Sequence, residues 1–344
     1  MMGEATTVVL AALLLGIAVF SVYARSIVGG LGKFLVRANV NKQNAKAQLT
    51  FGEVTLASGT KAWFSERPAE EGSHRPPLVI LPGATVSMEF MGAYMSAVLQ
   101  EMPGRRICII ELPHHGRNLA EDLDFSHPTS SIRGMVAYVE EVREALGIED
   151  NFDLMGYSLG GGIAAQYASG HPGSVRRLLL LAPYFYETAG DGFRDHMDRR
   201  DWRKVHGWES YKEMRHFFFY WLGMDPKSAL PGLVLRGIHG VRHEVYPSGY
   251  WSLFYDALEE ASGPSRTVLA DTSDALAALQ NPVLLVCAEN DLVCDSVKLL
   301  QLQTIIGEDS CEVLQVECGH AFGPGGKTLF EIGQPAICEF FQAP

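Results

Sequence analysis

The strongest constraint on the fold is the stretch FDLMGYSLGGG, which runs from Phe152 to Gly162. An apolar run comes before the pentapeptide GYSLG, and a run of small and apolar residues that can continue as a helix comes after it. This order predicts a strand, a sharp turn with Ser158 at its apex, and a helix. Residues two before and two after the apex must be small, and Gly156 and Gly160 meet that requirement. A glycine-rich turn with an ordinary serine is the competing interpretation.

A serine hydroxyl is a poor nucleophile near neutral pH, so it needs a base to take its proton and an acid to orient that base. We predict His320 as the base, because it follows the last expected strand. We predict Asp291 as the acid, because it follows the expected strand 283–287. The order serine, aspartate, histidine along the chain is one in which such triads occur.

Each assignment leaves alternatives. His114 and His115 also follow an expected strand, although they come before the serine, so they remain alternative bases or substrate contacts. Glu289 and Asp295 flank the predicted acid and remain alternatives to it. Five further histidines lack the spacing of metal ligands, so we predict no metal site and no cofactor. They are His196, His206, His216, His239 and His243.

A tetrahedral intermediate needs two backbone donors for its oxyanion. One should be the N–H of Leu159, at the start of the helix after the serine. The other should be the N–H of Ala84, in the loop after the expected strand 78–81. Pro82 has no N–H to donate, whereas Gly83 lets the chain turn tightly there.

Short apolar runs that predict strands alternate with longer segments that predict helices from residue 49 onward. Such alternation implies an α/β fold with a mostly parallel sheet and helices on both faces. Reactive groups collect at the carboxyl ends of the strands in sheets of this kind. The expected strands are 51–56, 61–65, 78–81, 106–111, 152–155, 177–181, 283–287 and 312–316, and the expected helices are 88–101, 132–146, 161–168, 296–306 and 327–341.

The alternation breaks between Tyr184 and about Leu276. Half of the chain's aromatic residues, 17 of 34, lie between Tyr184 and Tyr255. So many rings in a helical, strand-poor segment predict a cap insertion at about 184–276 that covers the strand ends. We expect most of these rings to pack against one another and a minority to face a ligand.

The segment from Ala5 to Ala24 holds 20 residues without a charge. At about 1.5 Å per residue it would form a helix of about 30 Å, long enough to cross a bilayer. We therefore predict a single N-terminal transmembrane helix. A signal peptide cleaved after Val22-Tyr23-Ala24 is one alternative, although the start MMGEATT lacks a basic region, and a buried helix is another.

Five basic residues follow this segment before the first acid, Glu53, and this bias predicts a cytoplasm-facing domain. They would also attract anionic lipid head groups. Because Gly29, Gly30 and Gly32 should break a long helix, we expect 26–48 to be an interfacial linker, or else a solvated one. The expected domains are thus 1–46, anchor and basic linker, and 47–344, the globular domain. The basic residues are Arg25, Lys33, Arg37, Lys42 and Lys46.

Charge and cysteine content limit the partners and the compartment. The formal charge is −12, and because residues 1–46 carry +4, the remainder carries −16, which argues against a nucleic-acid partner. Six cysteines show no CxxC pair, so we expect reduced, buried thiols and a cytosolic-facing domain. They are Cys108, Cys287, Cys294, Cys311, Cys318 and Cys338.

Three motifs carry a family resemblance: the elbow at 156–161, Asp291-Leu292-Val293, and Cys318-Gly319-His320. Residues 47–344 resemble proteins of the α/β-hydrolase fold. With its expected anchor and basic flank, the chain resembles the membrane-anchored monoacylglycerol lipases of that superfamily. The resemblance implies Ser158 as nucleophile with the aspartate and histidine as its partners, and the two predicted oxyanion donors, Ala84 and Leu159.

The chain departs from this family at two places. Pro82-Gly83 stands where the family usually has His-Gly, and Pro113-His114-His115-Gly116 stands where it usually has a glycine-rich loop. The expected function is a serine hydrolase that cleaves fatty acyl esters, such as a monoacylglycerol, at a membrane. The alternatives are a hydrolase of a soluble small substrate, either a small-ester esterase or a carbon–carbon bond hydrolase, and a non-catalytic binding protein.

Overall fold

The computed structural model describes residues 29–119, 124–126, 128–206, 210–225, 232–262, 276, 277, 279 and 281–343. Its centre is an eight-stranded sheet in the order β1-β2-β4-β3-β5-β6-β7-β8. The two pairings of β2 are antiparallel, and every neighbouring pair from β4 to β8 is parallel, so the predicted mostly parallel sheet is confirmed. The strands are β1 Thr50–Thr55, β2 Lys61–Arg67, β3 Leu78–Leu81, β4 Ile107–Ile110, β5 Phe152–Tyr157, β6 Val175–Leu181, β7 Val283–Ala288 and β8 Cys311–Val316.

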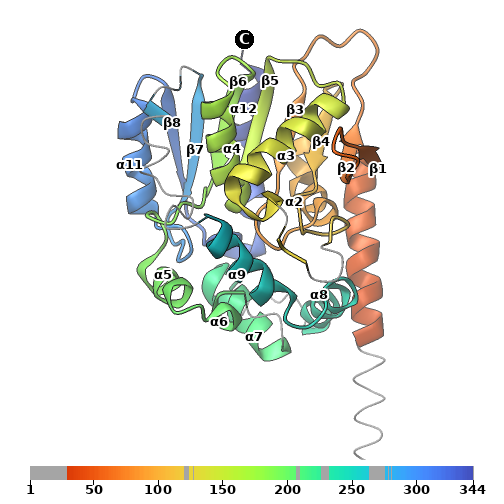
Figure 1. Ribbon diagram of the computed structural model, residues 1–344, viewed down its shortest axis with the longest axis vertical. Coiled ribbons are helices and arrows are strands. Elements are labelled where there is room, and N and C mark those ends of the chain that lie inside the picture. Colours follow the sequence, from red (N-terminus) through yellow and green to blue (C-terminus); the bar gives the residue numbers. More distant parts are fainter. Residues whose placement is uncertain are drawn as a thin grey trace, which may run out of the picture.

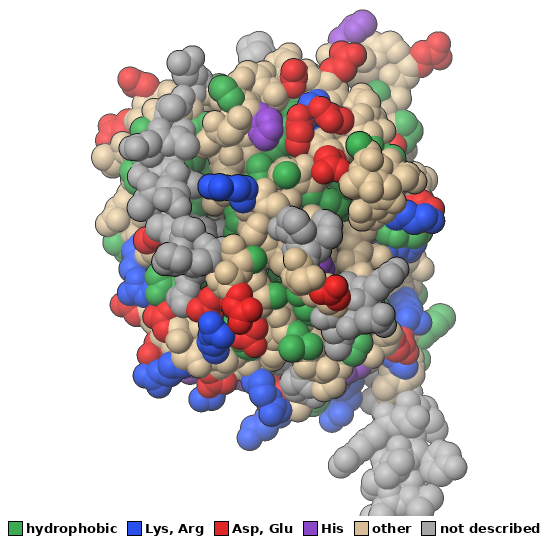
Figure 2. Space-filling model, viewed as in Figure 1, with side chains coloured by type: hydrophobic (Ala, Val, Ile, Leu, Met, Phe, Trp, Pro, Cys, Tyr) green, Lys and Arg blue, Asp and Glu red, His purple; other side chains and the backbone are tan. Residues whose placement is uncertain are grey.

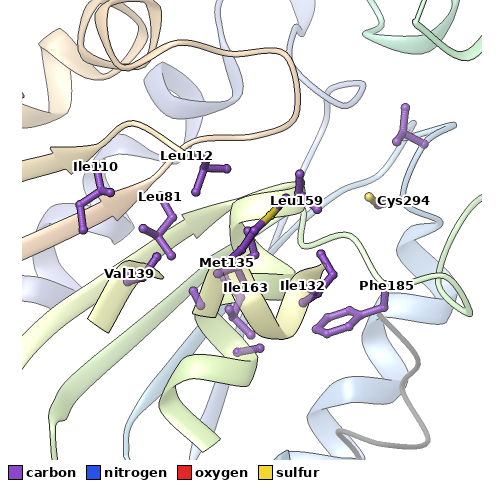
Figure 3. Close-up of a cluster of buried hydrophobic side chains, with 14 of the residues drawn as sticks. Leu81, Ile110, Leu112, Ile132, Met135, Val139, Leu159, Ile163, Phe185 and Cys294 are labelled. Carbon is purple, nitrogen blue, oxygen red and sulfur yellow. The ribbon is translucent and has the colours of Figure 1, made fainter. Parts of the chain in front are cut away.

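Helices cover both faces of the sheet (Figure 1). On one face lie α3 (Ile132–Ala145), α4 (Leu159–Gly170) and α11 (Ser296–Ile306), and on the other α2 (Met88–Gln100) and α12 (Leu329–Gln342). Successive residues of a strand point to opposite faces, and the central strands β3 and β4 are apolar throughout. β5 differs by one buried carboxylate, Asp153, which pairs with Arg105 and Arg176. Figure 3 shows the first of these layers, where Leu81 and Ile110 from the sheet pack with Met135 and Val139 from α3.

The segment between β6 and β7 is helical in its described parts, as the sequence predicts. Figure 1 shows its helices gathered at one end of the sheet, where they form a separate layer. Because parallel strands all end at the same edge, this layer covers the loops that follow the central strands. Its elements are α5 Asp191–Asp198, α6 Trp202–His206, α7 Tyr211–His216, a π-helix Phe217–Trp221, α8 Gly232–Val245 and α9 Tyr250–Ser262.

The expectation that glycines keep the basic segment from forming a helix is wrong for residues 29–46. These residues form a helix whose Lys33 and Arg37 each lie 2.5 Å from a carboxylate oxygen of Glu244 on α8. A Cβ atom on Gly237 would lie 2.2 Å from the carbonyl oxygen of Gly32. The absence of a side chain at Gly237 therefore allows α8 to approach the backbone at Gly32 closely, and this packing offsets the poor helix propensity of glycine.

No helix in the described part of the chain is long and apolar enough to span a bilayer. The expected anchor, Ala5 to Ala24, lies outside the described residues, so it stays a prediction. The described helix begins at residue 29, only a few residues after that segment.

All six cysteines are free and buried, as predicted. Burial raises the pKa of the Cys287 and Cys318 thiols to about 12, so both are protonated near neutral pH. A buried, protonated thiol is a poor nucleophile, and these side chains serve as small apolar groups of the core.

Candidate active site

The turn between β5 and α4 holds Ser158 in a strained conformation. Its φ is 53° and its ψ is −119°, a combination that is sterically costly for a residue with a side chain. The strand ends at Tyr157 and the helix begins at Leu159, so the serine alone makes the turn. The predicted strand, turn and helix are confirmed.

Glycines are required on both sides of this turn. A Cβ atom on Gly156 would lie 2.2 Å from the carbonyl oxygen of Gly160. A Cβ atom on Gly160 would lie 2.3 Å from the carbonyl oxygen of Leu81, the last residue of β3. No side chain fits in either place, so the small residues expected from the sequence are a steric necessity.

The structure brings the three predicted triad residues together. The Nε2 atom of His320 lies 2.9 Å from the Oγ atom of Ser158, and its Nδ1 atom lies 2.7 Å from the Oδ2 atom of Asp291. All three residues are buried. The other carboxylate oxygen, Oδ1, accepts hydrogen bonds from the N–H groups of Val293 (2.7 Å) and Cys294 (2.9 Å). The aspartate is thereby fixed with one oxygen directed at the imidazole.

Two neighbours that the sequence analysis missed hold the histidine loop. The ring of Tyr157 stacks on the imidazole of His320 at 5.3 Å, and its hydroxyl donates a hydrogen bond of 3.1 Å to the carbonyl of the same residue. The carbonyl of Leu222, in the cap, accepts from the N–H groups of Ala321 and Phe322 at 3.2 and 3.1 Å. Tyr157 occupies a position that the G-x-S-x-G pattern leaves open, and Leu222 has no sequence motif, so neither role was visible in the sequence.

The alternative bases lie elsewhere. The Nε2 atom of His114 is 3.1 Å from the hydroxyl of Ser130, and the Nδ1 atom of His115 is 2.8 Å from the carbonyl of Pro113. Both rings pack against Phe254 of α9. Burial lowers the pKa of His115 to about 3, so that imidazole stays neutral. Neither histidine contributes to the wall of the cavity that contains the serine.

The two alternative acids, Glu289 and Asp295, do not contact the imidazole of His320. The Oδ1 atom of Asp295 accepts from the N–H groups of Val297 (2.9 Å) and Lys298 (3.2 Å), which caps the amino end of α11. Glu289 is exposed to solvent. Of the three candidate carboxylates, only that of Asp291 reaches the imidazole of His320.

Both predicted oxyanion donors line the same cavity as Ser158 and His320. Leu159 is the first residue of α4, where a backbone N–H has no acceptor within its own helix and the helix dipole is positive. Ala84 follows Gly83, whose Cβ atom, if present, would lie 2.9 Å from the Tyr157 ring. The glycine lets the loop after β3 approach the elbow this closely.

The cavity above the triad encloses about 110 Å³ and has mainly apolar walls. Among the described residues of the cap, five aromatic side chains form part of these walls, and these are the rings placed to face a ligand. A second cavity of about 340 Å³ lies beside it, and the two share Thr85, Phe90 and Arg242 as wall residues. The five aromatics are Tyr184, Phe193, Phe217, Phe218 and Tyr255.

Among the described residues, Asp291, Cys294 and His320 place one potential metal-ligand atom each within 4.8 Å of one another. This set does not fit a metal site. The imidazole and the carboxylate already hydrogen-bond each other, and burial raises the pKa of the Cys294 thiol far above its usual value. Zinc and related ions are bound by the thiolate, which this environment disfavours.

A family model described as the alpha/beta hydrolase fold matches residues 76–323, nearly three quarters of the chain, including the whole triad and both oxyanion candidates. The chain belongs to the alpha/beta hydrolase fold family. Within this family, monoacylglycerol lipase ABHD6 of Rattus norvegicus is 25% identical over 268 residues, which cover 75% of this chain and 72% of that protein. Abhydrolase domain-containing protein abhd-5.2 of Caenorhabditis elegans is 23% identical over 169 residues, 49% of this chain and only 36% of that protein.

Solved structures share the fold at lower sequence identity. A putative lipase from Acinetobacter baumannii superposes with a TM-score of 0.69 at 14% identity, covering 88% of this chain and 93% of its own. A membrane phospholipase A, described as a bacterial virulence factor, superposes with a TM-score of 0.67 at 19% identity, covering 90% and 92%. At these identities the likeness shows the alpha/beta hydrolase fold.

The steric requirement at the elbow predicts the effect of one methyl group. Gly160→Ala should destabilise the protein by about 1–3 kcal/mol, because the new Cβ must displace the end of β3. Gly170→Ala is the matched control on the same helix, since nothing lies within 4 Å of its Cβ position, and it should leave the free energy of unfolding unchanged or raise it. Chemical denaturation measures both, and equal stabilities of the two variants would contradict the packing described.

Proposed function

We propose that the protein is a serine hydrolase that cleaves carboxylic esters of fatty acyl chains, such as monoacylglycerols, through an acyl-enzyme intermediate. The observation that carries the proposal is the line of hydrogen bonds from Ser158 through His320 to Asp291, beside an apolar cavity. The line supplies a nucleophile, a base and an orienting acid, and the cavity suits the chain of a fatty acid.

In the first step, the Ser158 hydroxyl attacks the ester carbonyl while the Nε2 atom of His320 takes its proton. The Asp291 carboxylate accepts the Nδ1–H of the imidazole, which fixes the tautomer and stabilises the imidazolium that forms. Negative charge develops on the former carbonyl oxygen. The N–H groups of Ala84 and Leu159 would donate to this oxyanion, and such preset donors stabilise the transition state more than the ground state.

In the second step, the intermediate collapses and the carbon–oxygen bond to the alcohol breaks. His320 returns its proton to the leaving alcohol oxygen, and the acyl group stays on Ser158 as an ester. A water molecule then gives its proton to the same imidazole and attacks the acyl-enzyme. Collapse of the second intermediate releases the fatty acid and restores the serine hydroxyl.

The walls of the cavity favour an acyl chain over a polar substrate, because they are mainly aromatic and aliphatic. The volume of about 110 Å³ is below the roughly 300–1,000 Å³ of ordinary ligand pockets. A long chain therefore requires the adjoining cavity of about 340 Å³ or a displacement of cap side chains. The names of the relatives, a monoacylglycerol lipase among them, support a lipid ester.

The small volume is also the observation that favours a second candidate, a hydrolase of a soluble small substrate. A meta-cleavage product hydrolase and a carboxylesterase share the fold, so a carbon–carbon bond hydrolase or a small-ester esterase is compatible with this architecture. A non-catalytic binding protein has no need of a complete hydrogen-bonded triad, which argues against that alternative.

We further propose that the N-terminal region holds the domain at a lipid surface, with residues 47–344 facing the cytoplasm. The helix 29–46 exposes Leu31 (49%), Phe34 (67%) and Leu35 (39%) at helical spacing, a few residues after the uncharged segment of the sequence. The helix 29–46 runs along the molecule from its cap end (Figure 1), and Lys and Arg side chains are frequent along that edge (Figure 2). This arrangement supports a cap close to the head groups.

The role of the acid predicts unequal effects for two neighbouring aspartates. Asp291→Asn should lower kcat on a short ester by about 10⁴-fold, because an amide does not hold the working tautomer of His320. Asp295→Asn, which alters only the cap of α11, should leave kcat near the wild-type value. A larger loss in the second variant than in the first would move the acid to position 295.

Acyl chain length separates the two enzyme candidates. On a series of p-nitrophenyl esters, kcat/KM should be higher for medium and long chains than for acetate, because each methylene buried in the cavity adds about 0.8 kcal/mol of favourable transfer. A steady fall in kcat/KM from acetate upward would favour the soluble-substrate alternative.

If the N-terminal segment is an anchor, its deletion should lower activity on a substrate in vesicles but not on a dispersed substrate. Deletion of residues 1–28 keeps the helix that pairs with Glu244, so the protein should still hydrolyse dispersed short esters at the wild-type rate. It should lose most of its activity on monoacylglycerol in anionic vesicles, because the removed segment supplies local concentration and no catalytic group. Unchanged activity on vesicles, or a natural mature form that begins near Arg25, would contradict the anchor.

A further inference from the structure

We propose that Arg242, on cap helix α8, is a positioning residue that holds the oxyanion loop, residues 83–87, in its working conformation. The inference rests on the proposed function, because it gives the loop a role in stabilising the oxyanion. The residue acts on Thr85, which directly follows the predicted donor Ala84, and no sequence motif marks it.

The loop contains a strained residue that needs support. Thr85 has a φ of 65°, in the left-handed region, where the branched side chain of threonine is strongly disfavoured. The residue is buried and lines the cavity beside Ala84 and Ser158. Strain of this kind persists only where surrounding contacts impose it.

Arg242 supplies one of these contacts. Its Nη1 group donates a hydrogen bond to the carbonyl of Thr85. The guanidinium lies 5.5 Å from the ring centre of Tyr246 and 5.6 Å from that of Trp251, so aromatic faces fix its orientation. Burial lowers the pKa of Arg242 to about 10, which still leaves it protonated at neutral pH.

The loop is held from a second side by Glu111. The Oε1 atom of this buried carboxyl group accepts from the N–H of Met88, at the start of α2, at 3.0 Å. Ser87 is the N-cap residue of α2, and its side chain makes no capping hydrogen bond, so Glu111 performs that task. With the carbonyl of Thr85 and the N–H of Met88 both fixed, the peptide groups between β3 and α2 have little freedom to rotate.

The helix 29–46 contacts α8, the helix that carries Arg242. Glu244, two residues further along α8, pairs with Lys33 and Arg37, and Gly237 packs against Gly32. The hydrogen bond to Thr85 joins the cap to the oxyanion loop, and the ion pairs of Glu244 join the cap to the N-terminal helix.

The test uses full-length protein and p-nitrophenyl butyrate. Arg242→Met removes the donor at similar side-chain length, and it should lower kcat by about 10²–10³-fold with little change in KM, the pattern of a lost transition-state interaction. Adding Thr85→Gly to Arg242→Met should raise kcat at least about tenfold above that of Arg242→Met alone, because glycine adopts a positive φ without steric cost. Loss of packing alone does not predict this rescue.

Two further variants control for position and for folding. Arg236→Met removes an exposed arginine of the same helix, which lies over Tyr211, and it should keep the wild-type kcat. Arg242→Lys keeps a charged donor, so it should lose less kcat than Arg242→Met. If Arg242→Met does not fold, Arg242→Lys takes its place in the test.

An effect of Arg242→Met on KM alone, or a double variant no faster than the single one, would overturn the positioning role. These results differ from failure of the proposed function, which would appear as an absence of ester hydrolysis by the wild-type protein and by Arg236→Met.

Discussion

The backbone conformation of Ser158 is the constraint on which the rest of the site depends. Its N–H donates to the carbonyl of Leu181 on the neighbouring strand at 3.0 Å, and its own carbonyl accepts from Gly161 (2.8 Å) and Tyr184 (2.9 Å). These bonds hold a residue at a φ of 53° that would relax in isolation. The surrounding glycines, the tight approach of β3 and the parallel register of β5 and β6 all serve this turn.

The local sequence was sufficient to predict those elements whose bounds are set by interactions between neighbouring residues. β3 and α11 have the predicted bounds, because the strand is an uninterrupted apolar run and the helix lies between the N-cap Asp295 and Gly307. The triad was predictable because each member follows a recognisable strand. The helix 29–46 was not predictable from its own sequence, because glycine can either weaken a helix or permit close packing between helices. Here the contact with Gly237, which is distant in sequence, favours close packing. The contact of Arg242 with Thr85 spans 157 residues and has no local pattern.

In the proposed mechanism, the cap contacts the loops that carry the reacting groups and also forms part of the walls of the cavity. Through the carbonyl of Leu222 it holds the loop of His320, and through Arg242 it holds the loop of Ala84. A long acyl chain needs either the adjoining cavity of about 340 Å³ or a displacement of cap side chains. The same cap therefore contacts both loops of the proposed site and the walls of the cavity, and the helix 29–46 pairs with this cap through Glu244.

The most direct test of the account is to locate the nucleophile by mass spectrometry after reaction with a fluorophosphonate. The account predicts a single modified peptide with the adduct on Ser158, and no adduct in Ser158→Ala protein of unchanged melting temperature. An adduct on another serine, or unmodified wild-type protein under conditions that label a reference serine hydrolase, would contradict it.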